Sequence, residues 1–246
     1  MRYVLVIILA ASGCFSQSST FAGPGTIAGP GTVAGGANTS GITYVNQTLP
    51  YHNTSTNTAT SASTNMTGAN FFITAAMTFD STALTCGDSV GGNSWQYATN
   101  YSNVTLCYAI NATASGTQTF TCKSNFVGCI TYGFTFPDTN GAIDQQCGLG
   151  PGSGTSIQPS ASCTPTVNNE LIFTAIGLTA TSTTPSVSGT GSFSTPGFLN
   201  FSSGTNYGVA AAYQIQTTKT AEQPTWSFSN QGGFATVSVT LQTFEP

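Results

Sequence analysis

Charge is the scarcest property of this 246-residue chain, which carries three Lys+Arg and seven Asp+Glu. Charged residues make up 4% of the sequence, against about 25% in an average soluble domain. So few cations cannot form the basic patch that nucleic-acid binding requires. Helix formers such as Lys, Arg, Glu and Leu are also scarce, which argues against a charged helical bundle.

The residues that usually carry catalysis or bind zinc are scarce as well. His52 is the only histidine, and the chain has no C-x-x-C pair. A Ser-His-Asp triad would therefore depend on His52, which lies in a Thr- and Asn-rich segment. The seven carboxylates form no pair that an Arg, His or Lys accompanies, as a glycosidase-like site would need. We expect a protein that is not an enzyme and has no cofactor and no zinc site.

Hydroxyl, amide and apolar side chains are abundant. Thr, Ser, Asn and Gly supply 116 residues, yet 39% of the chain is hydrophobic, with 16 Phe and 9 Tyr. That apolar content argues against disorder. Short β-prone runs separated by Gly, Asn, Ser and Pro are expected as strands at 42–49, 71–79, 83–87, 93–98, 105–112, 117–124, 129–136, 170–178, 206–216, 225–230 and 234–244.

Alternation within these runs predicts the fold class. Val237, Val239 and Leu241 fall on one face of a strand, while the residues between them are polar. A period of two with a polar outer face is typical of antiparallel sheets. The sequence therefore predicts an all-β fold over residues 42–246: a single antiparallel, jelly-roll-like β-sandwich of about eleven strands.

The N-terminus predicts export. Met1-Arg2 precedes an uninterrupted apolar run over residues 3–11, which is typical of a secretory signal peptide and too short to span a bilayer. We place the signal peptide at residues 1–15. Ala11-Ser12-Gly13-Cys14 resembles a bacterial lipobox, which would lipidate Cys14 and provide the only membrane contact. Ordinary signal cleavage is the alternative, and either way the protein is expected outside the cell or at its surface.

Residues 16–41 form a low-complexity arm. AGPGTI at 22–27 is followed directly by AGPGTV at 28–33. Gly and Pro at this density cannot continue a helix or a central strand. The segment is predicted to be a flexible tether. The alternative is an extended segment that docks at the sheet edge of a neighbouring subunit.

Six cysteines remain after Cys14. An even number in an exported chain favours disulfides, although sequence alone cannot choose the pairing. We prefer sequential pairing, because each bridge then joins neighbouring strands or closes a local loop. The preferred bridges are Cys86–Cys107, Cys122–Cys129 and Cys147–Cys163.

Four motifs resemble a largely uncharacterised family of secreted bacterial β-sandwich domains. Residues 88–95 are similar to its turn "D-x-x-G-N-x-[YW]", and residues 142–145 to its step "P-V-D-Q". Residues 169–173 are similar to its strand "N-E-L-L-[FV]", and residues 212–215 to its penultimate strand. The resemblance covers roughly residues 42–246, with one extra glycine in the turn and the six cysteines as departures. It implies the β-sandwich fold and carries no catalytic residues across.

Two groups of residues are candidates for ligand binding. Trp95 and Tyr97 are two positions apart, so they point to the same face of one strand. Exposed, they would form a platform for sugar rings; buried, they would belong to the core. Asp138, Asn140 and Asp144 form a weak candidate for a calcium loop, with a plain turn as the alternative.

These observations favour a non-catalytic secreted or cell-surface binding or adhesion module that contacts glycans or other surface polymers. The alternative is a structural subunit of an extracellular filament or appendage, whose partners are copies of itself. That alternative draws on the low charge, because the sheet edges lack the lysines that usually prevent edge-to-edge pairing.

Overall fold

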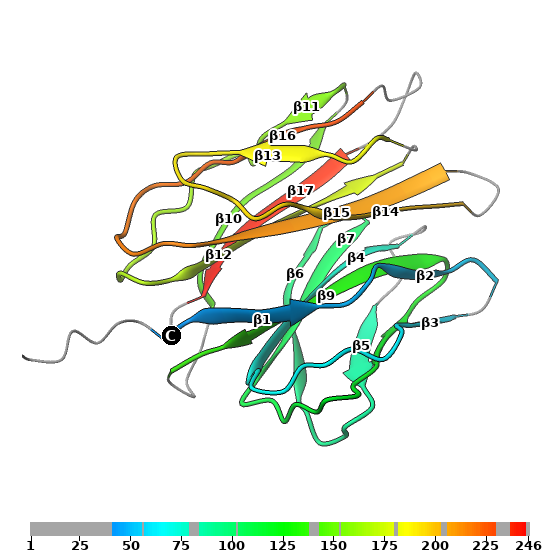
Figure 1. Cartoon of the computed structure of the whole chain (residues 1–246). Helices are drawn as coiled ribbons and strands as arrows, with labels where there is room; N and C mark the ends of the chain where they lie inside the picture. The colour runs from blue at the N-terminus through cyan, green and yellow to red at the C-terminus, as the bar shows by residue number, and fades with distance from the viewer. Residues whose placement is uncertain are drawn as a thin grey trace, which may run out of the picture. The chain divides into compact units, whose positions relative to one another are not determined.

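The computed structural model describes residues 41–244 except 56, 79–83, 102, 138–142, 153, 180–181, 203–205 and 230–236 (Figure 1). The predicted signal peptide, Cys14 and residues 16–40 of the predicted arm lie outside the described residues. All regular elements in the described part of the chain are β-strands in antiparallel sheets, which confirms the all-β prediction. A search of the same residues finds no helix that could cross a membrane.

The first large sheet is built from the N-terminal half of the domain. Its order is β1 (Thr43–Gln47), β9 (Val127–Thr135), β4 (Phe71–Thr78), β7 (Val104–Ile110) and β6 (Trp95–Tyr101). A short strand, β2 (Tyr51–Asn53), also pairs with β9 on its β1 side.

The second large sheet is built from the C-terminal half. Its order is β10 (Ile143–Gly152), β17 (Val237–Phe244), β12 (Leu171–Leu178), β15 (Asn206–Ile215) and β14 (Gly197–Ser202). Neither β10 nor β14 was predicted from the sequence, because both mix Gly with polar residues and show no clear alternation.

The main hydrophobic core lies between these two sheets. Phe71, Ile73, Ala75 and Met77 of β4 share one cluster with residues of the second sheet such as Phe173. Alternate residues of β4 belong to a different cluster, so this strand is buried on both faces. Burial of both faces explains why its sequence, FFITAAMT, is nearly continuously apolar.

Two small sheets cover the outer faces of the large ones (Figure 1). The order β3 (Thr58–Thr60), β8 (Phe120–Lys123), β5 (Thr85–Asp88) packs against the first sheet, and the order β11 (Ser156–Ile157), β16 (Thr225–Ser227), β13 (Ser186–Ser188) packs against the second. Phe120 and Trp226 are their fully buried aromatic residues. The single sandwich expected from sequence therefore has an additional layer on each side.

The two halves of the domain repeat one topology. When β2, which has no counterpart, is left out, replacing each strand of the first half (residues 43–135) by its counterpart in chain order gives the strand order of the second half (residues 143–244), for the large and the small sheets alike. The register agrees as well: Phe71 pairs with Ile110 and Phe134, and Leu171 pairs with Ile215 and Phe244. The domain thus contains an internal structural repeat.

All three preferred disulfides are present. Cys86–Cys107 joins β5 to β7 and Cys122–Cys129 joins β8 to β9, so both attach the first small sheet to the first large sheet. Cys147–Cys163 joins β10 to the segment that follows β11. Three disulfides fit an oxidising compartment and are therefore consistent with an extracellular protein.

Candidate functional site

Trp95 lies half-buried on β6. Its ring stacks on Phe72 with a centroid distance of 6.3 Å and an interplanar angle of 16°, and meets Phe120 edge-on. The indole Nε1 donates a hydrogen bond of 2.9 Å to Oδ2 of Asp88. Trp95 thus packs against the cluster between the first large sheet and its small sheet.

Tyr97 lies on the same face of β6, as the spacing predicted, because it pairs with Cys107 two positions from the Trp95–Ala109 pair. Its side chain is 54% exposed, and its hydroxyl donates to the carbonyl oxygen of Leu84. Trp95 is thus half-buried and Tyr97 exposed on one strand face, and a role for the pair in ligand binding stays a prediction.

The turn that precedes Trp95 closes the β5–β6 loop onto the segment after β7. Oδ1 of Asp88 accepts from the backbone N–H of Val90 at 3.0 Å, and Oδ2 accepts from Asn93 Nδ2 at 3.0 Å. Asn93 also donates to the carbonyl oxygen of Thr113 and accepts from its N–H. We call this arrangement the Asn93 latch.

The calcium candidate is only partly described. Asp138 and Asn140 lie outside the described residues. The two carboxylate oxygens of Asp144 accept hydrogen bonds from Thr166, at 2.8 Å from its N–H and 2.7 Å from its hydroxyl. Within the described part of the chain, no group of three His, Cys, Asp or Glu residues could hold a metal ion.

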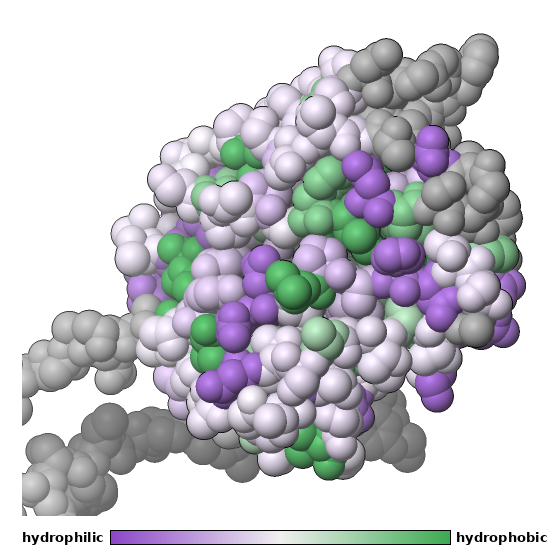
Figure 2. Space-filling model, turned by 45° about the vertical axis from the view of Figure 1, so that its right-hand side comes forward, coloured by the Kyte–Doolittle hydropathy of each residue, from purple (hydrophilic) through white to green (hydrophobic). Residues whose placement is uncertain are grey.

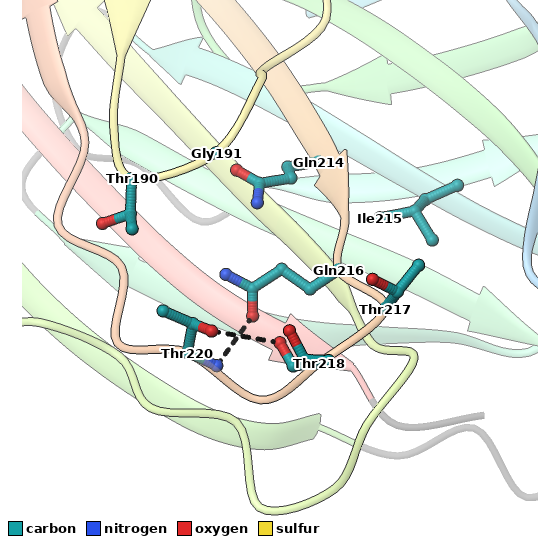
Figure 3. Close-up of a pocket in the computed structure, with 8 residues that line it drawn as sticks. All are labelled: Thr190, Gly191, Gln214, Ile215, Gln216, Thr217, Thr218 and Thr220. Atoms are coloured by element: carbon teal, nitrogen blue, oxygen red, sulfur yellow. Dashed lines mark hydrogen bonds between the residues drawn. The ribbon is translucent and has the colours of Figure 1, made fainter.

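A pocket that the sequence did not predict opens in the second half, at the end of β15 (Figure 3). Its volume is about 230 Å³. Its described lining carries hydroxyl, carboxamide and aliphatic side chains and no charged one: Thr190, Gly191, Gln214, Ile215, Gln216, Thr217, Thr218 and Thr220. The β13–β14 loop and the segment after β15 thus form its walls.

Gln214 is the central residue of this pocket. Its side chain is only 8% exposed, and its Oε1 has no hydrogen-bond partner among the described residues. A buried acceptor without a partner costs about 1–3 kcal/mol. Gly191 lies directly against the carboxamide, so a Cβ at that position would collide with Nε2 of Gln214. The carboxamide of Gln214 is therefore packed against the β13–β14 loop, with its Oε1 closed off from solvent.

Glu222 holds the wall opposite β15. It is fully buried, and its carboxylate accepts from the N–H groups of Thr190 at 2.9 Å and Gly191 at 3.2 Å. Its backbone forms a two-bond bridge to Cys163, which belongs to the third disulfide. Glu222 is thus a positioning residue that links the wall of the pocket to the Cys147–Cys163 bridge.

Gln216 is the second buried carboxamide of the lining. Its Oε1 accepts a hydrogen bond of 3.4 Å from the N–H of Thr220, whose hydroxyl donates to the carbonyl oxygen of Thr218 (Figure 3). These bonds fold the loop after β15 back over the strand end. A sequence signal was present, because Gln214 and Gln216 are polar residues two positions apart at the end of an apolar strand.

The structural repeat identifies the residue of the first half that is equivalent to Gln214. Phe72 pairs with Ala109 in the first half, and Ile172 pairs with Gln214 in the second, so Gln214 is the counterpart of Ala109. Trp95 pairs with Ala109 in the first half, and the Asn93 latch closes the loop beside it. The position that pairs with Trp95 in the first half is therefore equivalent to one that lines the pocket in the second.

On the inner face of the second sheet, Tyr213 stacks on Tyr44 of β1, with a centroid distance of 5.2 Å and an interplanar angle of 19°. Burial, followed by the nearby phenol of Tyr44, raises the pKa of Tyr213 to about 12. Burial also raises the pKa of Tyr44. Both phenols therefore stay neutral and act as packing residues at physiological pH.

No family model, curated protein or solved structure matches this chain.

Proposed function

We propose that the chain is an exported, non-catalytic binding module, a jelly-roll-like β-sandwich that contacts a neutral, hydroxyl-rich surface polymer such as a glycan. The observation that carries the proposal is an uncharged pocket at the end of β15, whose described lining consists of four threonines, two glutamines, one glycine and one isoleucine.

The chemistry of the lining favours a ligand of this class. Threonine hydroxyls and glutamine carboxamides both donate and accept hydrogen bonds, which matches the hydroxyl groups of a sugar. Ile215 adds an aliphatic surface for the C–H groups of a sugar ring. An anionic ligand would find no cation in the described lining of this pocket, so a neutral ligand fits best.

The remaining support concerns location and surface. The disulfides and the predicted signal peptide favour an extracellular or cell-surface position. Figure 2 shows a face on which residues of intermediate hydropathy dominate and apolar residues form small separate groups. A small pocket binds one ligand weakly, so adhesion would depend on many copies acting together.

A glycan array tests this proposal. The full chain, purified from an oxidising secretion host, is applied to neutral and acidic glycans, beside Gln214→Leu. We expect the wild type to bind neutral glycans on the array and the Gln214→Leu variant not to bind them. Gln118→Leu is the matched control, because Gln118 is a fully buried carboxamide of the first half, outside the pocket. A wild type that retains no neutral glycan would contradict the proposal.

One observation favours the structural-subunit alternative. Leu49, between β1 and β2, is 76% exposed, and Tyr44 is 38% exposed on β1, which is the edge strand of the first large sheet. Negative-stain electron microscopy of the secreted material distinguishes the two functions. Filaments that Leu49→Lys abolishes, without any glycan binding, would favour the subunit.

A further inference from the structure

We infer that residues 20–35 of one copy of the chain add as an extended strand to the open edge of the first large sheet in a second copy. We call residues 20–35 the docking segment and residues 43–49, which comprise β1 and the two residues after it, the β1 edge. The partner is therefore another copy of this chain. The inference goes beyond the proposed glycan site, which lies in the other half of the domain.

The β1 edge is exposed and apolar. Among the described strands, β1 pairs with β9 alone (Figure 1), and none of its five residues is buried. Two of the exposed large hydrophobic side chains, Tyr44 and Leu49, belong to this edge. An edge strand presents backbone N–H and C=O groups on its outer side, so it is a template for one more strand.

Charge does not protect this edge. No Asp, Glu, Lys or Arg occurs between Arg2 and Asp80, a stretch that contains the docking segment and β1. Natural sheets usually discourage edge pairing with charged side chains or with proline. The equivalent edge strand of the second half, β10, contains both Asp144 and Pro151, whereas β1 contains neither a charge nor a proline. The β1 edge is therefore the less protected of the two.

The docking segment has an apolar residue at every sixth position. Its sequence, TFAGPG-TIAGPG-TVAG, repeats with Phe21, Ile27 and Val33 at equivalent places. In an extended strand, six residues span about 20 Å and end on the same face. The β1 edge is seven residues long and is followed by Pro50. Two successive apolar residues of the segment therefore fit along it, and Ile27 belongs to either pair.

The prolines of the segment allow pairing along one of its edges only. Successive N–H groups of a strand point to opposite edges, so odd-numbered and even-numbered residues donate on different sides. Pro24 and Pro30 are both even-numbered, so the odd side keeps all its donors. Proline occurs in sheets on edge strands, with its nitrogen facing solvent. The docked segment would therefore end the sheet and not accept a further strand.

The connection to β1 favours a second copy as the acceptor. Residues 36–41 join the docking segment to β1, so docking on the same copy would need the chain to reverse within them. A second copy accepts the segment without a reversal. The resulting contact is head to tail and repeats from copy to copy. It would supply the many copies on which adhesion by a weak site depends.

Complementation between two variants tests the inference. Ile27→Lys places a charge on the docking segment, and Leu49→Lys places one on the β1 edge. Sedimentation velocity of the secreted full chain should show wild-type oligomers whose mass rises with concentration. Each variant alone should be monomeric. Their equimolar mixture has one intact segment and one intact edge, so it should form dimers and nothing larger.

Two further variants sharpen the test. Val167→Lys is the matched control, because Val167 is an exposed apolar residue between β11 and β12, away from the β1 edge, and this variant should assemble like the wild type. Replacing Pro24 and Pro30 by alanine should give larger assemblies, because the outer side of the docked segment regains its donors.

Three results would overturn the inference: a wild type that is monomeric at every concentration, assembly by Ile27→Lys alone, or a mixture that stays monomeric. Urea unfolding of Leu49→Lys should match the wild type, which shows that lost assembly is not lost folding. The glycan array is a separate measurement, so a monomeric wild type that binds neutral glycans would overturn the inference and leave the proposed function in place.

Discussion

The two halves of the domain have the same strand order and the same register, yet their outer layers differ. In the first half two disulfides attach the small sheet, the Asn93 latch closes the loop, and Trp95 packs opposite Ala109. In the second half Gln214 replaces Ala109 and a pocket is open. The pocket is therefore a property of a few side chains on a shared scaffold, which is where function usually resides.

The central core shows a second difference between the halves. Met77 and Gly177 occupy equivalent positions, six residues after Phe71 and Leu171 in the paired strands. A Cβ at Gly177 would collide with Met77 Sδ and Val104 Cγ2. The long side chain of one half thus fills the space that the glycine of the other leaves.

The largest expected effect concerns the two tryptophans. Trp226 is fully buried and donates to the hydroxyl of Thr174 at 3.0 Å. Trp226→Ala should lower the free energy of unfolding by about 3–5 kcal/mol. Trp95→Ala should cost about 1–3 kcal/mol, because that ring is half-buried. Urea unfolding measures both, and equal losses would show that Trp95 is as much a core residue as Trp226.

The next effect separates stability from binding. Replacing Cys122 and Cys129, or Cys147 and Cys163, by alanine pairs should each cost up to about 2–4 kcal/mol, less for the shorter loop. Only the second pair should also weaken glycan binding, because Cys163 bridges to Glu222, which holds the wall of the pocket. Calorimetric titration of both variants with a neutral glycan that the array identifies checks this. Equal binding by both would separate the disulfide from the pocket.

The smallest effect concerns alkaline pH. The pKa of Tyr213 is raised to about 12, from an ordinary value of 10.0. The stabilisation of the folded state by the protonated phenol of Tyr213 is complete below pH 10. It is lost as the pH rises towards 12, because the unfolded chain releases the phenolic proton first. Tyr213→Phe should make this decline shallower. Unfolding measured across that range tests it, and an unchanged slope would indicate that another group is responsible.

Sequence reasoning predicted what depends on local pattern. Short β-prone runs bounded by Gly, Asn, Ser and Pro identified β4, β9, β12 and β15, and the preference for sequential pairing gave the right disulfides. The structural repeat was missed, because the halves share topology and register but little sequence beyond pairs such as Thr74-Ala75 and Thr174-Ala175. The pocket was not predicted, because it forms where the loops after β13 and β15 meet in space. Trp95 was interpreted from its strand face alone, and the sequence did not predict the small sheet that covers part of its ring.

The most direct test of the account is an NMR titration of side-chain amide signals. Gln118 and Gln214 are buried carboxamides in the two halves, so one spectrum of the full chain contains the site and its internal control. On addition of a neutral glycan that the array identifies, the signals of Gln214 and Gln216 should shift to saturation while that of Gln118 stays in place. Saturable binding that moves the signals of Trp95 and Gln118 and leaves Gln214 unchanged would contradict the account.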